Sequence, residues 1–294
     1  FYDTSKKYSL RGNDVIPVLF LNTLFCSAIF LPLILLSQYT YILDSSIFYV
    51  GSGGWEMHRW IILKSIIVLL SWMFGYFAIA QLPLTIVGPI NATRPVMTLV
   101  GAMLVFGERL NAWQWIGVSL AIISLFLLAR SGKREGIDFK HNKWIFFLVL
   151  AAVMGTCSGL LDKYLMASPE NGGVGLDRMM AQSWYNIYQC MMMGVVLLVY
   201  VFNQRKKVEH TARFSWKWSI LLISIFLLMA DFAYFYALSL PGAMISIVSM
   251  VRRGSVLISF LCGAVLFREK NLKAKAVDLC FVLLGMIFLW IGSR

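Results

Sequence analysis

Charged residues are scarce in this sequence: Asp, Glu, Lys and Arg make up only 14% of its 294 residues, while hydrophobic residues make up 60%. Soluble domains contain about a quarter charged residues and about half apolar ones, so this composition excludes an ordinary water-soluble domain. The mean hydropathy of +0.76 also indicates a predominantly apolar chain. The chain is therefore predicted to be an integral membrane protein.

Metal ligands and nucleophilic motifs are also sparse. The five cysteines fall inside apolar runs without metal spacing, and the three histidines lie in separate loops. Neither a nucleotide-binding loop, nor a His-Glu-x-x-His motif, nor a Gly-x-Ser-x-Gly motif occurs. We therefore expect no disulfide framework, no metal site, no cofactor and no enzymatic activity.

Acidic residues are outnumbered, with 14 Asp and Glu against 26 Lys and Arg. In a soluble chain this excess would favour a nucleic-acid partner, but here most basic residues stand in short loops between apolar runs, so no nucleic acid is expected. The chain start and the loops at 130–143, 205–217 and 268–275 share one side and carry 17 Lys and Arg; the other side carries five. The positive-inside rule predicts that this basic side is cytoplasmic and that residue 294 ends outside.

Nine apolar runs predict membrane-spanning helices, which need ~20 residues each. They are too long for the ~10-residue strands of a membrane barrel, so the predicted fold class is all-α. Asn13-Asp14 and Asp177 are predicted N-caps of the first and sixth runs. The runs cover residues 15–37, 60–82, 84–106, 113–129, 144–166, 179–202, 216–239, 242–267 and 276–292.

An internal duplication relates these runs. The segment from Phe232 to Pro241 matches the segment from Phe74 to Pro83 at five of ten positions, and each Leu-Pro pair predicts a tight helical hairpin. The first copy, residues 1–130, holds four runs; a basic loop at 131–143 connects it to the second copy, which extends to residue 294 and holds five. We expect the native chain to carry ~20 further apolar residues before Phe1. Five spans per copy is an odd number, which predicts an inverted-topology repeat.

Charges inside the runs mark the predicted site, because an ionised group near mid-bilayer costs at least ~2.5–3.5 kcal/mol and needs a partner or a wet cavity. Arg94 and Arg252 each follow a hairpin proline by eleven residues, ~16 Å along a helix, or about half of a ~30 Å hydrocarbon core. Asp231 should reach the depth of Arg252. Lys64 is expected to extend to the interface, and Asp278 to lie at the interface, near its helix start.

The predicted substrate site combines these bases with nearby aromatic residues. Guanidinium groups bind carboxylate or phosphate oxygens with two parallel bonds, so a surplus of bases predicts an anionic substrate at the midplane, between the copies. Asp231 is interpreted either as an ion-pair partner of arginine or as a coupling site for a proton or cation. The predicted substrate-binding residues are Arg252, Arg253, Arg94, Lys163, Tyr164, Tyr234 and Tyr76.

Each copy ends with an apolar helix, a turn and another apolar helix. The turns Phe106-Gly-Glu-Arg-Leu110 and Phe267-Arg-Glu-Lys270, with the paired Leu-Pro hairpins, resemble the drug/metabolite transporter superfamily, EamA type. The resemblance implies a ten-helix fold with a central cavity between the copies and alternating access. Members usually keep both termini cytoplasmic, which differs from the charge count. Plastid phosphate translocators of this superfamily hold phosphate with a Lys-Arg pair and a lysine, and Arg252, Arg253 and Lys163 are similar in kind and position.

The leading prediction is a secondary transporter of a small anionic metabolite, embedded in the lipids of the cell membrane as a monomer or homodimer. The alternative is a proton-coupled exporter of amino acids or amphipathic compounds that uses Asp231. Two other classes are an intramembrane enzyme and a non-transporting scaffold or receptor. Flux in proteoliposomes would separate a carrier from a scaffold.

Overall fold

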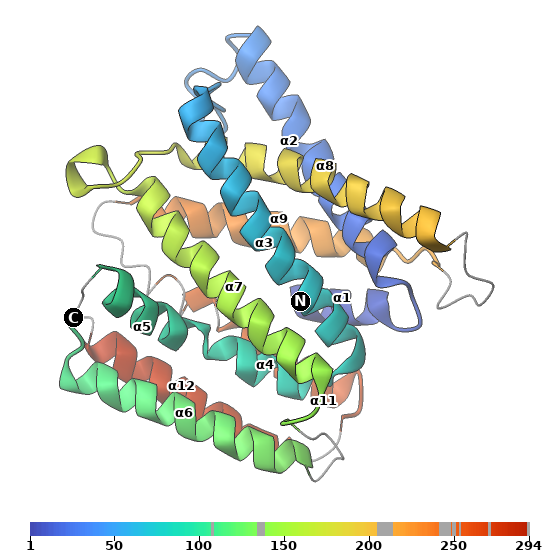
Figure 1. Ribbon diagram of the computed structural model, residues 1–294, viewed down its shortest axis with the longest axis vertical. Helices are drawn as coiled ribbons and strands as arrows, with labels where there is room; N and C mark the ends of the chain where they lie inside the picture. Colours follow the sequence, from blue (N-terminus) through green and yellow to red (C-terminus); the bar gives the residue numbers. More distant parts are fainter. Residues whose placement is uncertain are drawn as a thin grey trace.

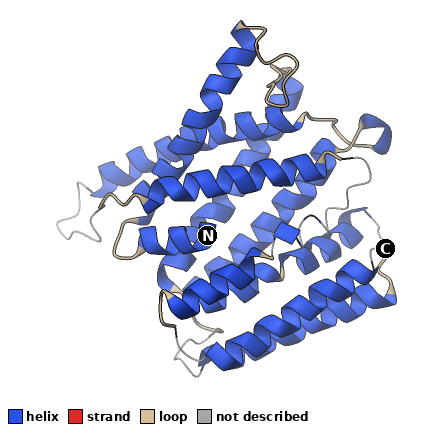
Figure 2. Ribbon diagram, turned by 180° about the vertical axis from the view of Figure 1, so that it is seen from behind, coloured by secondary structure: helices blue, strands red, loops and turns tan. Residues whose placement is uncertain are grey.

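The computed structural model describes residues 1–106, 109–133, 139–204, 214–240, 248, 251–252, 254–269 and 272–292. These residues form helices and short connections, with no strand among them, which confirms the predicted all-α class (Figures 1 and 2). The helices are α1 (Tyr2–Leu10), α2 (Val15–Tyr39), α3 (Trp55–Gln81), α4 (Leu84–Ala92), α5 (Arg94–Phe106), α6 (Ala112–Lys133), α7 (Lys143–Met166), η1 (Pro169–Asn171), α8 (Arg178–Gln204), α9 (Ser219–Leu238), α11 (Ser255–Val265) and α12 (Leu272–Gly292).

Six helices, α2, α3, α7, α8, α9 and α12, are long and apolar enough to cross a membrane. The apolar segments Ala112–Leu128 in α6 and Ser255–Val265 in α11 are shorter. Large apolar side chains such as Leu31, Phe126 and Leu198 are exposed on the outside of the helices. A bilayer accepts such side chains and requires helical backbone, so the protein is an integral membrane protein.

The predicted span at 84–106 is wrong as a single helix. It divides into α4 and α5 at Thr93. The physical reason is Pro95, which has no N–H for the carbonyl of Asn91 and whose ring collides with that carbonyl. Of the corresponding second-copy run at 242–267, the structure describes chiefly α11; Pro241 and Arg253 lie outside the described residues.

Local signals at the helix starts are confirmed. Asp14 caps α2 by accepting a bond from the Ile16 N–H at 3.3 Å, and Asp177 caps α8 by accepting one from the Met180 N–H at 2.8 Å. The predicted first hairpin is also present, since α3 ends at Gln81 and α4 begins two residues after Leu82. The sequence therefore fixes where these helices begin through ordinary capping chemistry.

The helices of the two halves of the chain pack against one another. The principal contacts are α6 with α12, α3 with α7, α2 with α8, α1 with α9, and α4 with α11. Figure 1 shows α6 and α12 side by side along one edge, and α3 beside α7. Each of these pairs joins the first half to the second, so the surfaces between the halves form most of the buried core.

Three charged residues occupy different positions from those predicted. Asp278 is buried seven residues into α12, because that helix begins at Leu272 and packs against α6, where Ser124 donates to the Asp278 carbonyl. Lys6, counted at the chain start, and Lys275, counted in the loop at 268–275, are also buried. The excess of basic residues on the basic side persists without them.

Candidate functional site

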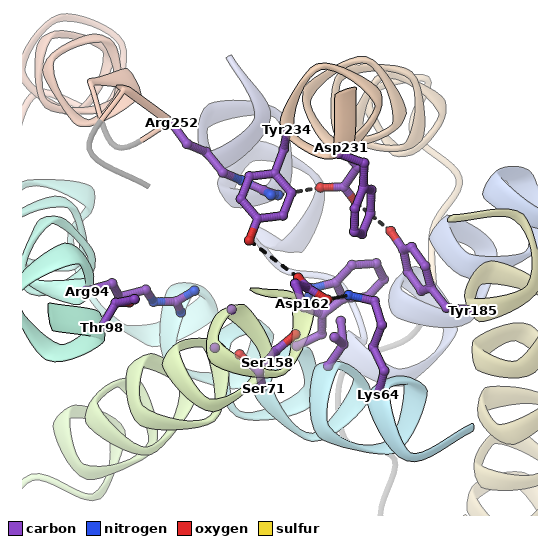
Figure 3. Close-up of a pocket in the computed structure, with 15 residues that line it drawn as sticks. Lys64, Ser71, Arg94, Thr98, Ser158, Asp162, Tyr185, Asp231, Tyr234 and Arg252 are labelled. Atoms are coloured by element: carbon purple, nitrogen blue, oxygen red, sulfur yellow. Dashed lines mark hydrogen bonds and ion pairs between the residues drawn. The ribbon is translucent and has the colours of Figure 1, made fainter. Parts of the chain in front are cut away.

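A cavity of about 100 Å³ lies where α3, α5, α7, α8 and α9 meet the segment before α11 (Figure 3). We call it the central cavity. Its volume is enough for several water molecules or a small polar solute. The walls combine aromatic rings with the charged residues Lys64, Arg94, Asp162, Asp231 and Arg252.

The first buried ion pair joins α3 to α7. The Lys64 ammonium binds the Asp162 carboxylate, and the two residues are only 2% and 4% exposed. The Tyr234 hydroxyl lies 3.4 Å from the other Asp162 oxygen. The expectation that Lys64 extends to the interface is therefore wrong: it lies ~13 Å along α3 from the helix start, beyond the reach of its side chain, and a carboxylate faces it.

A second ion pair, which is partly buried, joins α9 to the segment before α11. Arg252 binds the Asp231 carboxylate, as the equal depth of the two residues predicted. The Tyr185 hydroxyl donates to the other Asp231 oxygen at 2.5 Å, and the Arg252 guanidinium lies 4.6 Å from the centre of the Tyr234 ring. The carboxylate and the guanidinium are thus both held by several contacts.

Arg94 is the charged lining residue that has no carboxylate partner among the described residues. It is the first residue of α5, and its Nη2 donates to the Ala151 carbonyl at 3.2 Å. The Arg94 Nε is buried and has no hydrogen-bond partner among the described residues. The charges cancel within each of the two ion pairs, so the described lining of the central cavity has a net positive charge that comes from Arg94.

A second cavity, of about 90 Å³, shares Ser71, Trp72, Arg94 and Arg252 with the central cavity. Its remaining lining includes Asn91 on α4 and Ile79 near the end of α3. The two arginines therefore stand between the two cavities. Residues of α1, including Asp3 and Lys6, line the second cavity on its other side.

The structure brings four of the predicted site residues together at the central cavity: Arg94, Arg252, Tyr234 and Asp231. Tyr76 does not line it. Instead Tyr76 is fully buried, with the Lys6 ammonium 3.9 Å from the centre of its ring.

Lys163 and Tyr164 also lie outside the lining of the central cavity. Successive helix residues point in directions about 100° apart, so a helix that presents Asp162 to the cavity turns the next two residues away. The Tyr164 ring packs against Trp60, with 5.5 Å between ring centres. The structure therefore does not place these two predicted residues at the central cavity.

Four lining residues are not among those predicted from the sequence: Lys64, Ser71, Ser158 and Asp162. A signal was present, because polar and small residues recur at helical spacing along one face of α7. Gly155, Ser158, Gly159 and Asp162 all line the cavity. These positions share one face because 155 and 158, and 159 and 162, are three residues apart, while 155 and 159, and 158 and 162, are four apart.

Gly155 gives Arg94 its position beside α7. A Cβ at residue 155 would lie 2.6 Å from Arg94 Nη1, the far end of a flexible side chain. We therefore expect Gly155→Ala to displace the guanidinium and weaken anion binding about tenfold, the scale of one charge-assisted hydrogen bond, while the thermal unfolding temperature is unchanged or rises.

Gly194→Ala is the matched control for this substitution. Its Cβ would lie 3.7 Å from the Phe20 ring, an ordinary contact, in a helix far from Arg94 in the sequence. Binding by Gly194→Ala should equal that of the parent protein. Equal loss in both variants would show that Gly155 does not act through Arg94.

Membrane-spanning helices around a buried, charged cavity define a polytopic membrane protein with an internal polar site. Residues 1–130 match the family model described as the EamA-like transporter family, which confirms the resemblance predicted from the Gly-Glu turns and hairpins. The matched family implies a membrane transporter of small molecules and is generally non-enzymatic.

The remaining comparisons concern the fold. No curated protein sequence matches the chain. Among solved structures, 25 chains match; one of them is titled only "Crystal structure of protein". It is 12% identical, and the alignment covers 100% of this chain and 94% of that one with a TM-score of 0.64. At this identity the likeness shows a shared fold.

Proposed function

We propose that the protein is an alternating-access secondary transporter of the cell membrane that binds a small anionic metabolite between its repeats, residues 1–130 and 144–294. The observation that carries this proposal is the Arg94 guanidinium, which faces the central cavity without a carboxylate partner among the described residues. A charged group inside the membrane is unfavourable unless it has a partner or a wet cavity. A bound carboxylate or phosphate would supply the missing negative charge.

The helix that carries Arg94 supports the same charge preference. Residues Arg94 and Thr98 of its first turns line the cavity. Unpaired N–H groups and the helix dipole make the start of a helix favourable for anions. Interrupted helices whose ends point at the substrate occur in membrane transporters with inverted repeats, and α4 and α5 form such an interrupted pair.

The arrangement of the two cavities supports alternating access. Arg94 and Arg252 line both cavities, so an anion held by these residues lies at the boundary between two separate spaces. Opening one space while the other stays closed would expose the anion to one side of the membrane at a time. The contacts between the two halves of the chain are the surfaces that would move.

The second candidate function is proton-coupled export of amino acids or amphipathic compounds. It is favoured by the Asp231 carboxylate, which lines the cavity among the aromatic rings of Trp72, Tyr185 and Tyr234. We rank it second because Arg252 and Tyr185 already engage both oxygens of Asp231. This carboxylate is thereby explained as the partner of a neighbouring cation.

Ligand binding and flux test the proposal together. The purified protein should be stabilised against heating by selected carboxylates or phosphates, because a ligand that binds only the folded state raises its stability by mass action. The same anions should exchange across proteoliposome membranes. Asp231→Asn should retain this exchange. Stabilisation by cations alone, or loss of pH-driven uptake in Asp231→Asn with exchange intact, would favour the second candidate.

A further inference from the structure

The turn between α11 and α12 supplies the N-terminal cap of α4. Glu269 in this turn accepts bonds from the Leu84 N–H at 2.7 Å and the Thr85 N–H at 2.8 Å, and the Thr85 hydroxyl also donates to it. Pro83, which precedes α4, has no side-chain group to do this. A helix start is stabilised by a carboxylate that accepts bonds from its unpaired N–H groups. Here the carboxylate comes from the other half of the chain.

The surroundings of Glu269 are shaped for this contact. Arg268 has a φ of 50°, in the left-handed region that favours glycine, and the matching residue of the first-copy turn is Gly107. A Cβ on Gly263 would lie 3.1 Å from a Glu269 oxygen. The fully buried Lys275 donates to the Thr85 hydroxyl at 2.9 Å.

The capped helix leads directly to Arg94. Thr85 lies in the first turn of α4, α4 ends at Ala92, and Arg94 begins α5 directly after Thr93. Between them α4 lies close against α11: a Cβ on Gly88 would be 2.8 Å from a methyl group of Val256. The contact between the halves therefore runs from the Glu269 cap along α4 to the arginine that lines both cavities.

The cap also lies at the end of the molecule toward which the second cavity extends. Lys7 donates to the carbonyls of Ile79 and Leu82, which end α3 on the other side of the hairpin, each at 2.7 Å. Ile79 lines the second cavity. The hairpin before α4 is thus fixed by Lys7 on one side and by Glu269 on the other.

We propose that Glu269 is a positioning residue of the transport cycle. Its cap on α4 joins the two halves of the chain at the hairpin end, keeps the second cavity closed and holds Arg94 at the central cavity. The cap is released when the second cavity opens. This inference rests on the proposed transporter function, but its test measures conformation and needs no flux.

The test uses two cysteine reporters in lipid nanodiscs, on a chain whose five native cysteines are replaced. Val68→Cys reports on the central cavity and Asn91→Cys on the second cavity. Glu269→Ala should raise the labelling rate of the residue-91 reporter by a water-soluble maleimide about fivefold, the population change expected from the loss of a helix cap, and lower the rate of the residue-68 reporter. Glu269→Gln keeps an acceptor oxygen, so its labelling rates should lie between those of Glu269→Ala and those of the parent.

Two further variants make the test decisive. Arg268→Gly removes the neighbouring charge but suits the left-handed backbone, so both rates should equal those of the parent. Gly263→Ala presses on the carboxylate and should change both rates in the direction of Glu269→Ala. Faster labelling at residue 91 without slower labelling at residue 68, or no change in either, would overturn the proposal. If labelling becomes faster at residue 91 and slower at residue 68 but no flux is measurable, the role of Glu269 is supported and only the proposed transport function is contradicted.

Discussion

Replacement of Arg94 by Ala or Gln is expected to weaken the binding of the anion selected by thermal-shift screening about ten- to hundredfold. The reason is the loss of a charge-assisted hydrogen bond, ~1.5–3 kcal/mol, from an arginine that forms no ion pair among the described residues. Arg94→Lys should recover only part of the affinity, because an ammonium cannot reproduce the planar fork of a guanidinium. Isothermal titration with the purified variants measures these differences.

A surface arginine provides the matched control. Arg59 on α3 is exposed and pairs with Glu56, so Arg59→Ala removes the same type of side chain away from the cavity. Its anion affinity should equal that of the parent protein. The folded state of Arg94→Ala should be at least as stable as the parent without ligand, since the substitution removes a half-buried charge that forms no ion pair among the described residues. Normal anion binding by Arg94→Ala would refute the proposed site.

Much of the fold could be predicted because membrane helices are recognised by length and apolarity alone. The two N-caps and the first hairpin were also readable, since they depend on neighbouring residues. The division at Thr93 was not predicted, although Pro95 is a visible helix breaker. The break is hidden when only apolar length is considered, because the apolar segments on the two sides of Asn91 to Arg94 together have the length of one membrane span.

The site was harder to predict because pairing depends on which helices face each other. In the sequence Asp162 stands next to Lys163, whereas its partner in the structure is Lys64, 98 positions away on α3. Such pairing requires the packing of α3 against α7, which a single sequence does not reveal. Arg94, Arg252 and Asp231 were found because equal spacing from the two prolines sets their depth without knowledge of the packing.

The buried pair Lys64–Asp162 is expected to produce the largest change in stability. Lys64→Met or Asp162→Asn alone should lower the free energy of unfolding by ~3–5 kcal/mol, because each leaves one buried charge without its partner. The double variant Lys64→Met with Asp162→Leu removes both charges and keeps the volume nearly constant. The double variant should be close to the parent in stability. Thermal unfolding of the parent, the single variants and the double variant in detergent measures these differences.

The two single substitutions should have opposite effects on anion binding, which separates charge from packing. Lys64→Met removes the surplus positive charge of the described lining, so the bound anion should stabilise this variant less than the parent. Asp162→Asn adds one surplus charge and should increase stabilisation by the anion; a charge ~8 Å away contributes ~2 kcal/mol at an effective dielectric constant of ~20. The double variant leaves Arg94 as the surplus charge and should bind as the parent does. If all three variants bind the anion equally, the charge balance of the cavity does not determine its ligand, and the assignment of an anionic substrate is wrong.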